Sequence, residues 1–279
     1  ETSQHQTTMT ETGNRNSSGA KLTIRVSNNA LSFATDRRKD GRGIDYEPYD
    51  VNPGMSMAAN LRLAFAESRL LRRKYDSATV MMDTPVLMIP IEEFEDNNTE
   101  LLYSHMFTTN KSEQILTAVL PGQNAVAAFT MNSDLKLVVN DNFASSTIMP
   151  LMQPVWNYMH RRSFTGAHRK LFAYFHDKHV ELMSFRQNRF VFCNTFEATH
   201  ANDILYYIMY VWKQLGLDTA EAELHMAGDL AERDKLTGLL RQYISNVYII
   251  NPAADFGFPA ASEMKGLPFD LQVYYAKGR

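Results

Sequence analysis

The stretch between residues 170 and 250 limits most narrowly what this chain can fold into. Three short apolar segments are joined by the three-residue turns His176–Lys178 and Arg186–Asn188, and turns this short favour antiparallel strand pairs. Two further apolar segments each follow a helical pattern, which favours parallel strands joined by crossover helices. This is the order of a ribonuclease-H-like unit. The expected elements are strands at 171–175, 179–185 and 189–196, a helix at 202–215, a strand at 222–226, a helix at 230–243 and a strand at 247–250.

The helix expected at 202–215 is the best defined of these elements. Ile204, Ile208 and Trp212 recur at helical spacing, and Leu215 continues the same apolar stripe. A stripe of this kind usually packs into a core, so we predict that Trp212 is a core residue and not part of a binding surface.

The first part of the chain repeats the same order of strand, helix and strand. The three matched pairs are offset by 149, 144 and 144 residues, and offsets this nearly constant indicate a duplicated fold. The first copy is longer, and we expect its extra length between Thr84 and Asn142, after the last matched strand. The matched segments are 22–26 with 171–175, 57–71 with 201–215, and 78–83 with 222–227.

The sequence therefore predicts an α/β protein of two ribonuclease-H-like lobes. Each lobe is expected to hold a mixed sheet with a three-strand antiparallel meander and helical crossovers. Residues 1–20 are polar and lack an apolar core, so we expect a disordered tail and not a signal peptide. We expect lobe I at 21–163 and lobe II at 164–279, and lobe II includes an apolar tail without clear periodicity after Pro252.

Composition excludes several classes of protein. The chain has 279 residues, of which 44% are hydrophobic, so it can build a packed core. A net charge of −3 argues against bulk electrostatic binding to nucleic acid or to an anionic membrane. The longest apolar run, Ile204–Trp212, is far shorter than the roughly 20 residues that span a bilayer. The single cysteine, Cys193, cannot form an internal disulfide, and we expect a reducing, cytoplasmic location.

Two such units facing each other across a cleft are the layout of actin-like ATPases. Between about Lys21 and Pro252, the chain resembles a family of uncharacterised bacterial proteins assigned an actin-like ATPase fold. More distantly, it is similar to the actin-like platform proteins of cell division and of pilus or secretion-system assembly. The resemblance lies in the element order and the duplicated pattern, so it implies the fold more directly than an activity.

Actin-like ATPases bind nucleotide with three loops, and the resemblance to that family implies the same three loops in this chain. Two are hairpin turns of Asp-x-Gly type, in which the aspartate holds hydrated magnesium and the glycine lets backbone N–H groups approach phosphate. In the first loop, Arg25 stands at the aspartate position and Ser27 at the glycine position, and Asn28 follows them. A positive charge at the first position repels the metal that the family binds there.

The second and third loops also depart from the family pattern. Tyr174 stands at the second aspartate position, His176 stands at the glycine position, and Lys178 lies in the same turn. The third loop is a Gly-Gly turn in the family, whereas this chain has Gly228 followed by Asp229, a carboxylate that would lie near a polyanion. Three altered loops predict that the protein does not hydrolyse ATP with magnesium and carries no cofactor.

Metal binding is not expected from this sequence. His176 and His179, with Asp177 and Glu181 nearby, are ligand types, but they meet no fixed ligand spacing. Side chains three residues apart at a hairpin turn point in different directions. We therefore expect an exposed polar turn and no metal.

The function expected from these observations is binding or scaffolding without catalysis. The partner would be another protein of unspecified identity, and neither nucleic acid nor a membrane span is expected, since no basic stripe or long apolar run is present. The alternative is an enzyme or sensor that binds a nucleotide or other phosphorylated ligand without magnesium, with Arg25, His176 and Lys178 meeting the phosphates. The candidate cleft-lining residues are Arg25, Ser27, Asn28, Tyr174, His176, Lys178, Gly228 and Asp229.

Overall fold

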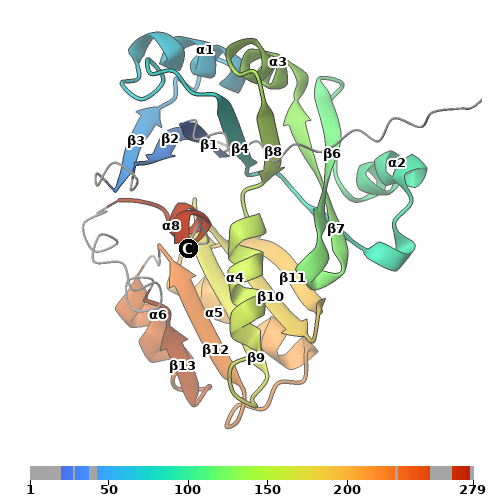
Figure 1. The fold of residues 1–279 in the computed structure, drawn as a ribbon. Helices are drawn as coiled ribbons and strands as arrows, with labels where there is room; N and C mark the ends of the chain where they lie inside the picture. The colour runs from blue at the N-terminus through green and yellow to red at the C-terminus, as the bar shows by residue number, and fades with distance from the viewer. Residues whose placement is uncertain (1–19, 28, 38–42, 230–231, 252–265, 277–279) are drawn as a thin grey trace, which may run out of the picture.

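The computed structural model describes residues 20–27, 29–37, 43–229, 232–251 and 266–276. It has two lobes, each built on a five-stranded mixed sheet (Figure 1). Helix α8 (Phe269–Ala276) lies between the lobes, and α4 (Gln153–Ser163) lies beside it along the sheet of lobe II. Except for Ala20, the tail expected at residues 1–20 lies outside the described residues. None of the described helices is both long enough and apolar enough to cross a membrane.

The sheet of lobe I has the strand order β3-β2-β1-β4-β8. The first three strands form an antiparallel meander, and β4 and β8 join it in parallel. Leu22 and Ile24 of β1 pack against Leu61 of α1, because every second strand residue faces the helix side of the sheet. The elements are β1 (Lys21–Ser27), β2 (Ala30–Asp36), β3 (Ile44–Asp50), α1 (Met57–Glu67), β4 (Ser77–Met82) and β8 (Ser146–Pro150).

Lobe I contains a segment between β4 and α3 (Ser133–Asn142) that has no counterpart in lobe II. It forms a three-stranded antiparallel sheet of order β5-β7-β6, which stands at one side of lobe I (Figure 1). This insertion ends before α3, earlier than the sequence predicts, because α3 and β8 repeat the helix and strand that end lobe II. The inserted elements are β5 (Leu87–Pro90), η2 (Ile91–Glu93), α2 (Asp96–Met106), β6 (Glu113–Leu120), η3 (Pro121–Gln123) and β7 (Ala125–Asn132).

The sheet of lobe II has the order β11-β10-β9-β12-β13. Its first three strands again form an antiparallel meander, and β12 and β13 again pair in parallel. The apolar stripe of α5 covers one face of this sheet, and Trp212 is only 2% exposed. The elements are β9 (Lys170–His176), β10 (His179–Arg186), β11 (Arg189–Glu197), α5 (Ala201–Gln214), β12 (Glu223–Gly228), α6 (Arg233–Leu240) and β13 (Asn246–Ile249).

The two strand orders confirm the predicted duplication. β4 pairs with β1 and β12 pairs with β9, so the two matched strands hold the same place and the same direction in their sheets. The predicted fold class, α/β with two ribonuclease-H-like lobes, is therefore confirmed.

A third core cluster joins the lobes, and α4 and α8 lie within it. It includes Met81 from the inner face of one sheet, Phe172 from that of the other, and Trp156 of α4. Leu271 and Val273 of α8 are fully buried in the same cluster. The apolar part of the tail at 269–276 is thus a helix inside the molecule, although its sequence shows no clear helical period.

Two helix ends differ from the sequence expectation. The sequence pattern predicts a helix from about Met55 to Lys74, whereas α1 ends at Glu67. The reason is that Glu47 of β3 accepts hydrogen bonds from the backbone N–H groups of Arg69 (3.0 Å) and Leu70 (2.9 Å), and a separate turn begins. The sequence also predicts Ser133 as the N-cap of the helix that follows it. In the structure the side chain of Asn132 accepts hydrogen bonds from the backbone N–H groups of Asp134 and Leu135, so Asn132 is the N-cap of α3.

Candidate functional site

A cleft of about 870 Å³ lies between the lobes. Arg25, Tyr46 and Asp50 line it from lobe I, and Tyr174 lines it from lobe II. The segment at 266–272, which leads into α8, forms a further wall. The cleft is therefore bordered by residues of all three predicted nucleotide loops and by α8, which the sequence does not connect with them.

Arg25 is buried in β1 and makes three hydrogen bonds to carboxylates. Its Nε donates to both oxygens of Asp270 at 3.2 and 3.1 Å, and its Nη2 donates to Asp177 Oδ2 at 2.7 Å. Burial alone would lower the pKa of the guanidinium, but Asp270 and Asp177 outweigh burial and raise that pKa above its ordinary value. Arg25 is therefore charged and is held by acidic groups from two other segments.

Tyr174 occupies the matching position in lobe II and contacts the same carboxylate. Its hydroxyl donates to Asp270 Oδ2 at 2.8 Å, and its ring stacks on His176 with centroids 4.9 Å apart. Burial and the Asp270 carboxylate raise the pKa of the Tyr174 hydroxyl well above its ordinary value, so the hydroxyl keeps its proton and remains a donor.

Asp270 of α8 joins these two positions. Its side chain is 0% exposed and accepts hydrogen bonds from both Arg25 and Tyr174. α8 is also bonded to the strands of lobe I, because the Tyr275 hydroxyl donates to Thr23 Oγ1 at 2.7 Å. The two positions that the resemblance to actin-like ATPases assigns to magnesium-binding aspartates are thus linked to each other through one buried carboxylate.

The third loop requires its glycine. Gly228 ends β12 with φ of +93°, and a Cβ there would lie 2.1 Å from the carbonyl oxygen of Phe175 and 2.8 Å from Tyr174 Cε2. The next residue, Asp229, donates its backbone N–H to Phe175 O at 3.0 Å and is exposed toward the cleft. This close approach fixes the strand end against the second loop.

Replacing Gly228 by alanine is expected to destabilise the protein by at least about 2 kcal/mol, because the new Cβ meets backbone at a left-handed φ. Chemical denaturation measures the change. Gly238 is the matched control, since it lies within α6 with nothing within 4 Å of its would-be Cβ. Gly238→Ala is expected to stabilise by about 0.5–1 kcal/mol. Equal effects of the two substitutions would contradict the close approach.

The remaining candidate residues do not gather around this cleft. Ser27 is buried at the end of β1, where its hydroxyl donates to Ala30 O at 3.5 Å, and it does not line the cleft. Lys178 is exposed in the β9–β10 turn with φ of +64° and does not line the cleft either. Asn28 lies outside the described residues. Five of the eight candidates, Arg25, Tyr174, His176, Gly228 and Asp229, line the cleft.

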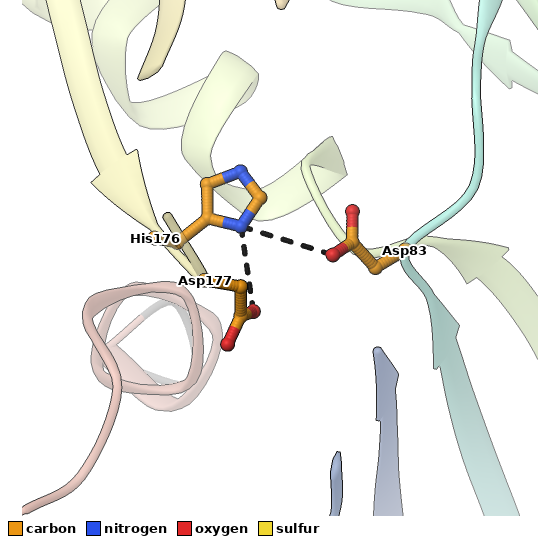
Figure 2. Close-up of side chains that lie close together, drawn as sticks. All are labelled: Asp83, His176 and Asp177. Atoms are coloured by element: carbon orange, nitrogen blue, oxygen red, sulfur yellow. Dashed lines mark ion pairs between the residues drawn. The ribbon is translucent and has the colours of Figure 1, made fainter. Parts of the chain in front are cut away.

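The turn at His176 is not the exposed polar turn that the sequence suggests. His176 is 6% exposed, and its ring faces Asp83, the residue that follows β4 of lobe I (Figure 2). His176 Nδ1 lies 3.9 Å from Asp83 Oδ2 and 3.5 Å from Asp177 Oδ2. A residue of the other lobe therefore completes a cluster of one imidazole and two carboxylates.

The charges in this cluster influence one another. Burial would lower the pKa of His176, but Asp177 and Asp83 outweigh burial and raise it above its ordinary value. Burial also raises the pKa of Asp83. For Asp177, burial is outweighed by His176 and Arg25, which hold its pKa well below the usual range.

Neither Asp270 nor the role of Asp83 is evident from the sequence pattern. A signal for Asp270 exists, because it is the lone charge between Phe269 and Leu271 in an apolar segment. An isolated carboxylate in such a segment is buried with a partner when the segment packs inward.

Comparison with solved structures confirms the predicted actin-like ATPase fold. A protein from Bacteroides thetaiotaomicron VPI-5482, described as having an actin-like ATPase fold and unknown function, is 27% identical, and the match covers 84% of this chain and 91% of that protein with a TM-score of 0.75. The PilM–PilN type IV pilus biogenesis complex is also similar, with 10% identity, coverage of 92% and 96%, and a TM-score of 0.57. At this identity the second likeness shows the fold alone.

Comparison at the sequence level identifies one family. No curated protein matches the chain. The sequence profile described as "Protein of unknown function (DUF3822)" matches residues 10–247, which include all strands and crossover helices of lobe I and the elements of lobe II from β9 to α6. The chain therefore belongs to the DUF3822 family.

Proposed function

We propose that this protein is an actin-fold binding or scaffolding module that does not hydrolyse ATP. The observation that carries the proposal is the hydrogen-bonded group of Arg25, Asp270 and Tyr174. A magnesium-dependent phosphoryl transfer needs acidic groups that hold the hydrated ion beside the phosphates. Here a guanidinium and a phenol stand at those two positions, and the carboxylate that they share is already bonded to both.

The proposed ligand is another protein. The similar structure that contains PilM is a complex with PilN, so an actin-fold protein there assembles with a second protein. This is support by analogy of fold, since fold alone does not determine function. Capture of a defined partner from cells of the native organism, with the full chain as bait, tests the protein-binding part of the proposal.

Purified protein is expected to release no phosphate from ATP above the buffer background, with or without magnesium. The physical reason is that Arg25 repels the metal and Tyr174 has no charge to hold it. Phosphate release over hours at millimolar ATP measures the activity. Turnover that is present in the wild type and lost in Arg25→Ala or in the milder Tyr174→Phe variant would contradict the proposal, because it would assign catalysis to these same side chains.

The alternative function is binding of a phosphorylated ligand without magnesium. It predicts a different result when the Tm is measured with nucleotides. Arg25 and His176 both line the cleft, although Arg25 already bonds to two carboxylates. We expect nucleotides to change the Tm by less than about 1 °C, since a ligand raises Tm only when it binds the folded state. A larger rise that does not depend on magnesium and occurs without turnover would favour the alternative.

A further inference from the structure

The cluster of Asp83, His176 and Asp177 has the composition of a metal site. One ligand atom from each of these side chains lies within 4.8 Å of the others. The set contains one imidazole nitrogen and two carboxylate oxygens, and imidazole favours zinc and other first-row transition metals over magnesium and calcium. The position differs from the two aspartate positions of the nucleotide loops, which hold Arg25 and Tyr174 in this chain.

The imidazole of His176 supplies an independent observation. Its side chain is 5% exposed, and neither ring nitrogen has a hydrogen-bond partner within the described part of the chain. A buried polar atom without a partner costs roughly 1–3 kcal/mol, so native proteins rarely leave one. Figure 2 shows that Nδ1 points toward both carboxylates, which is the direction that a shared ion requires.

The distances also fit a bound ion better than direct hydrogen bonds. Ligand atoms held tetrahedrally at about 2.0–2.2 Å from zinc lie about 3.3–3.6 Å from one another. His176 Nδ1 lies 3.5 Å from Asp177 Oδ2, within that range, and 3.9 Å from Asp83 Oδ2, which a small rotation of the Asp83 side chain would shorten.

Carboxylates outnumber the permanent cations around His176, which favours binding of a metal cation. Asp83, Asp177 and Asp270 are three carboxylates around one permanent cation, Arg25, which bonds to the last two of them. Glu181 adds a further carboxylate, and His179 lies farther out, with its ring centroid 6.3 Å from that of His176. Arg25 shares the Asp177 oxygen and so weakens its pull on a metal, which leaves the nitrogen of His176 as the selective ligand.

We propose that Asp83, His176 and Asp177 bind one divalent transition-metal ion of the zinc type, and that this ion links lobe I to lobe II. Asp83 follows β4 of lobe I, whereas His176 and Asp177 lie at the end of β9 in lobe II. The proposal departs from the sequence expectation of no metal, because that expectation considered only ligands within one hairpin. Three protein ligands leave a further position for water or for an anionic group in the cleft.

A calorimetric titration of the chelator-treated full chain with zinc chloride tests the proposal. We expect one equivalent to bind, the Tm to rise with zinc concentration, and millimolar magnesium not to compete. Replacing His176 by Gln is expected to weaken zinc binding by at least about 100-fold. Removal of a group that only orients a metal ligand typically weakens binding by about 10- to 100-fold, so a larger loss identifies His176 as a ligand. His179→Gln is the matched control in the same hairpin and should leave the affinity unchanged.

A second variant separates loss of the ligand from loss of the fold. Asp83→Asn keeps the side-chain shape at a half-buried position of the other lobe and is expected to weaken zinc binding as strongly as His176→Gln. Circular dichroism establishes that each variant is folded. The proposal is overturned if the wild type binds no zinc, or if zinc binds equally well to the wild type and to folded Asp83→Asn.

Discussion

Replacing Asp270 by alanine is expected to destabilise the protein by about 3–5 kcal/mol, because removing one member of a buried ion pair leaves the other charge uncompensated. Asp270 is 0% exposed and accepts hydrogen bonds from Arg25 and Tyr174. After the substitution, Arg25 keeps only Asp177, and the Tyr174 hydroxyl loses its acceptor inside the core. Chemical denaturation followed by far-ultraviolet circular dichroism measures the free energy of unfolding.

Two further variants show whether this loss comes from the pair. Asp141 is an exposed aspartate at the end of α3, and Asp141→Ala is expected to change stability by no more than about 0.5 kcal/mol. In a double-mutant cycle, Arg25→Met combined with Asp270→Leu should cost less than the two single effects added together, since no charge is then left without a partner. Simple additivity of the two substitutions would show that the side chains do not interact.

Replacing Trp212 by alanine is expected to cost about 3–5 kcal/mol, the usual cost of removing a large aromatic side chain from a core. Trp212 is 2% exposed and packs with Ile208 and Val211 in the core of lobe II. Its indole N–H has no acceptor among the described residues. For that reason, Trp212→Phe should cost clearly less than Trp212→Ala, because the smaller ring fills most of the space without burying an unpaired donor.

The same helix provides the control for this prediction. Tyr206 lies on the solvent-exposed side of α5 and is 65% exposed. Tyr206→Ala is expected to change the free energy of unfolding by no more than about 0.5 kcal/mol in the same denaturation measurement. If Trp212→Ala cost under about 1 kcal/mol, the side chain would have to face solvent in solution.

The duplicated fold could be predicted because each lobe encodes it locally. The apolar periodicity of α5 and the short turns between β9, β10 and β11 are local patterns that can be recognised in short stretches of sequence. The repeat in lobe I shows the same order of elements a second time. The sequence predicts the insertion in the right region but extends it through α3, because only the strand order shows that α3 repeats α6.

The candidate site could be predicted only in part, because its groups come from distant segments. Asp270 and Arg25 are 245 residues apart, and no local pattern connects them. His176 is buried against Asp83 of the other lobe, so tertiary packing covers a turn whose sequence favours exposure. Helix α8 itself lacks a one-sided apolar stripe, because the core surrounds it on most sides. Apolar residues are therefore favoured around most of the helix and not along one face.

The position of α8 has a consequence for synthesis of the chain. Tyr275 bonds to Thr23, 252 residues earlier, and α8 covers the inner face of the lobe I sheet. At about 5–20 residues per second, a ribosome needs on the order of 10–50 s to make the chain between these contacts. During that interval nascent lobe I holds Arg25 without its buried carboxylate and leaves an apolar sheet face open to water. We therefore expect lobe I to be a client of ribosome-associated chaperones until residues 269–276 emerge.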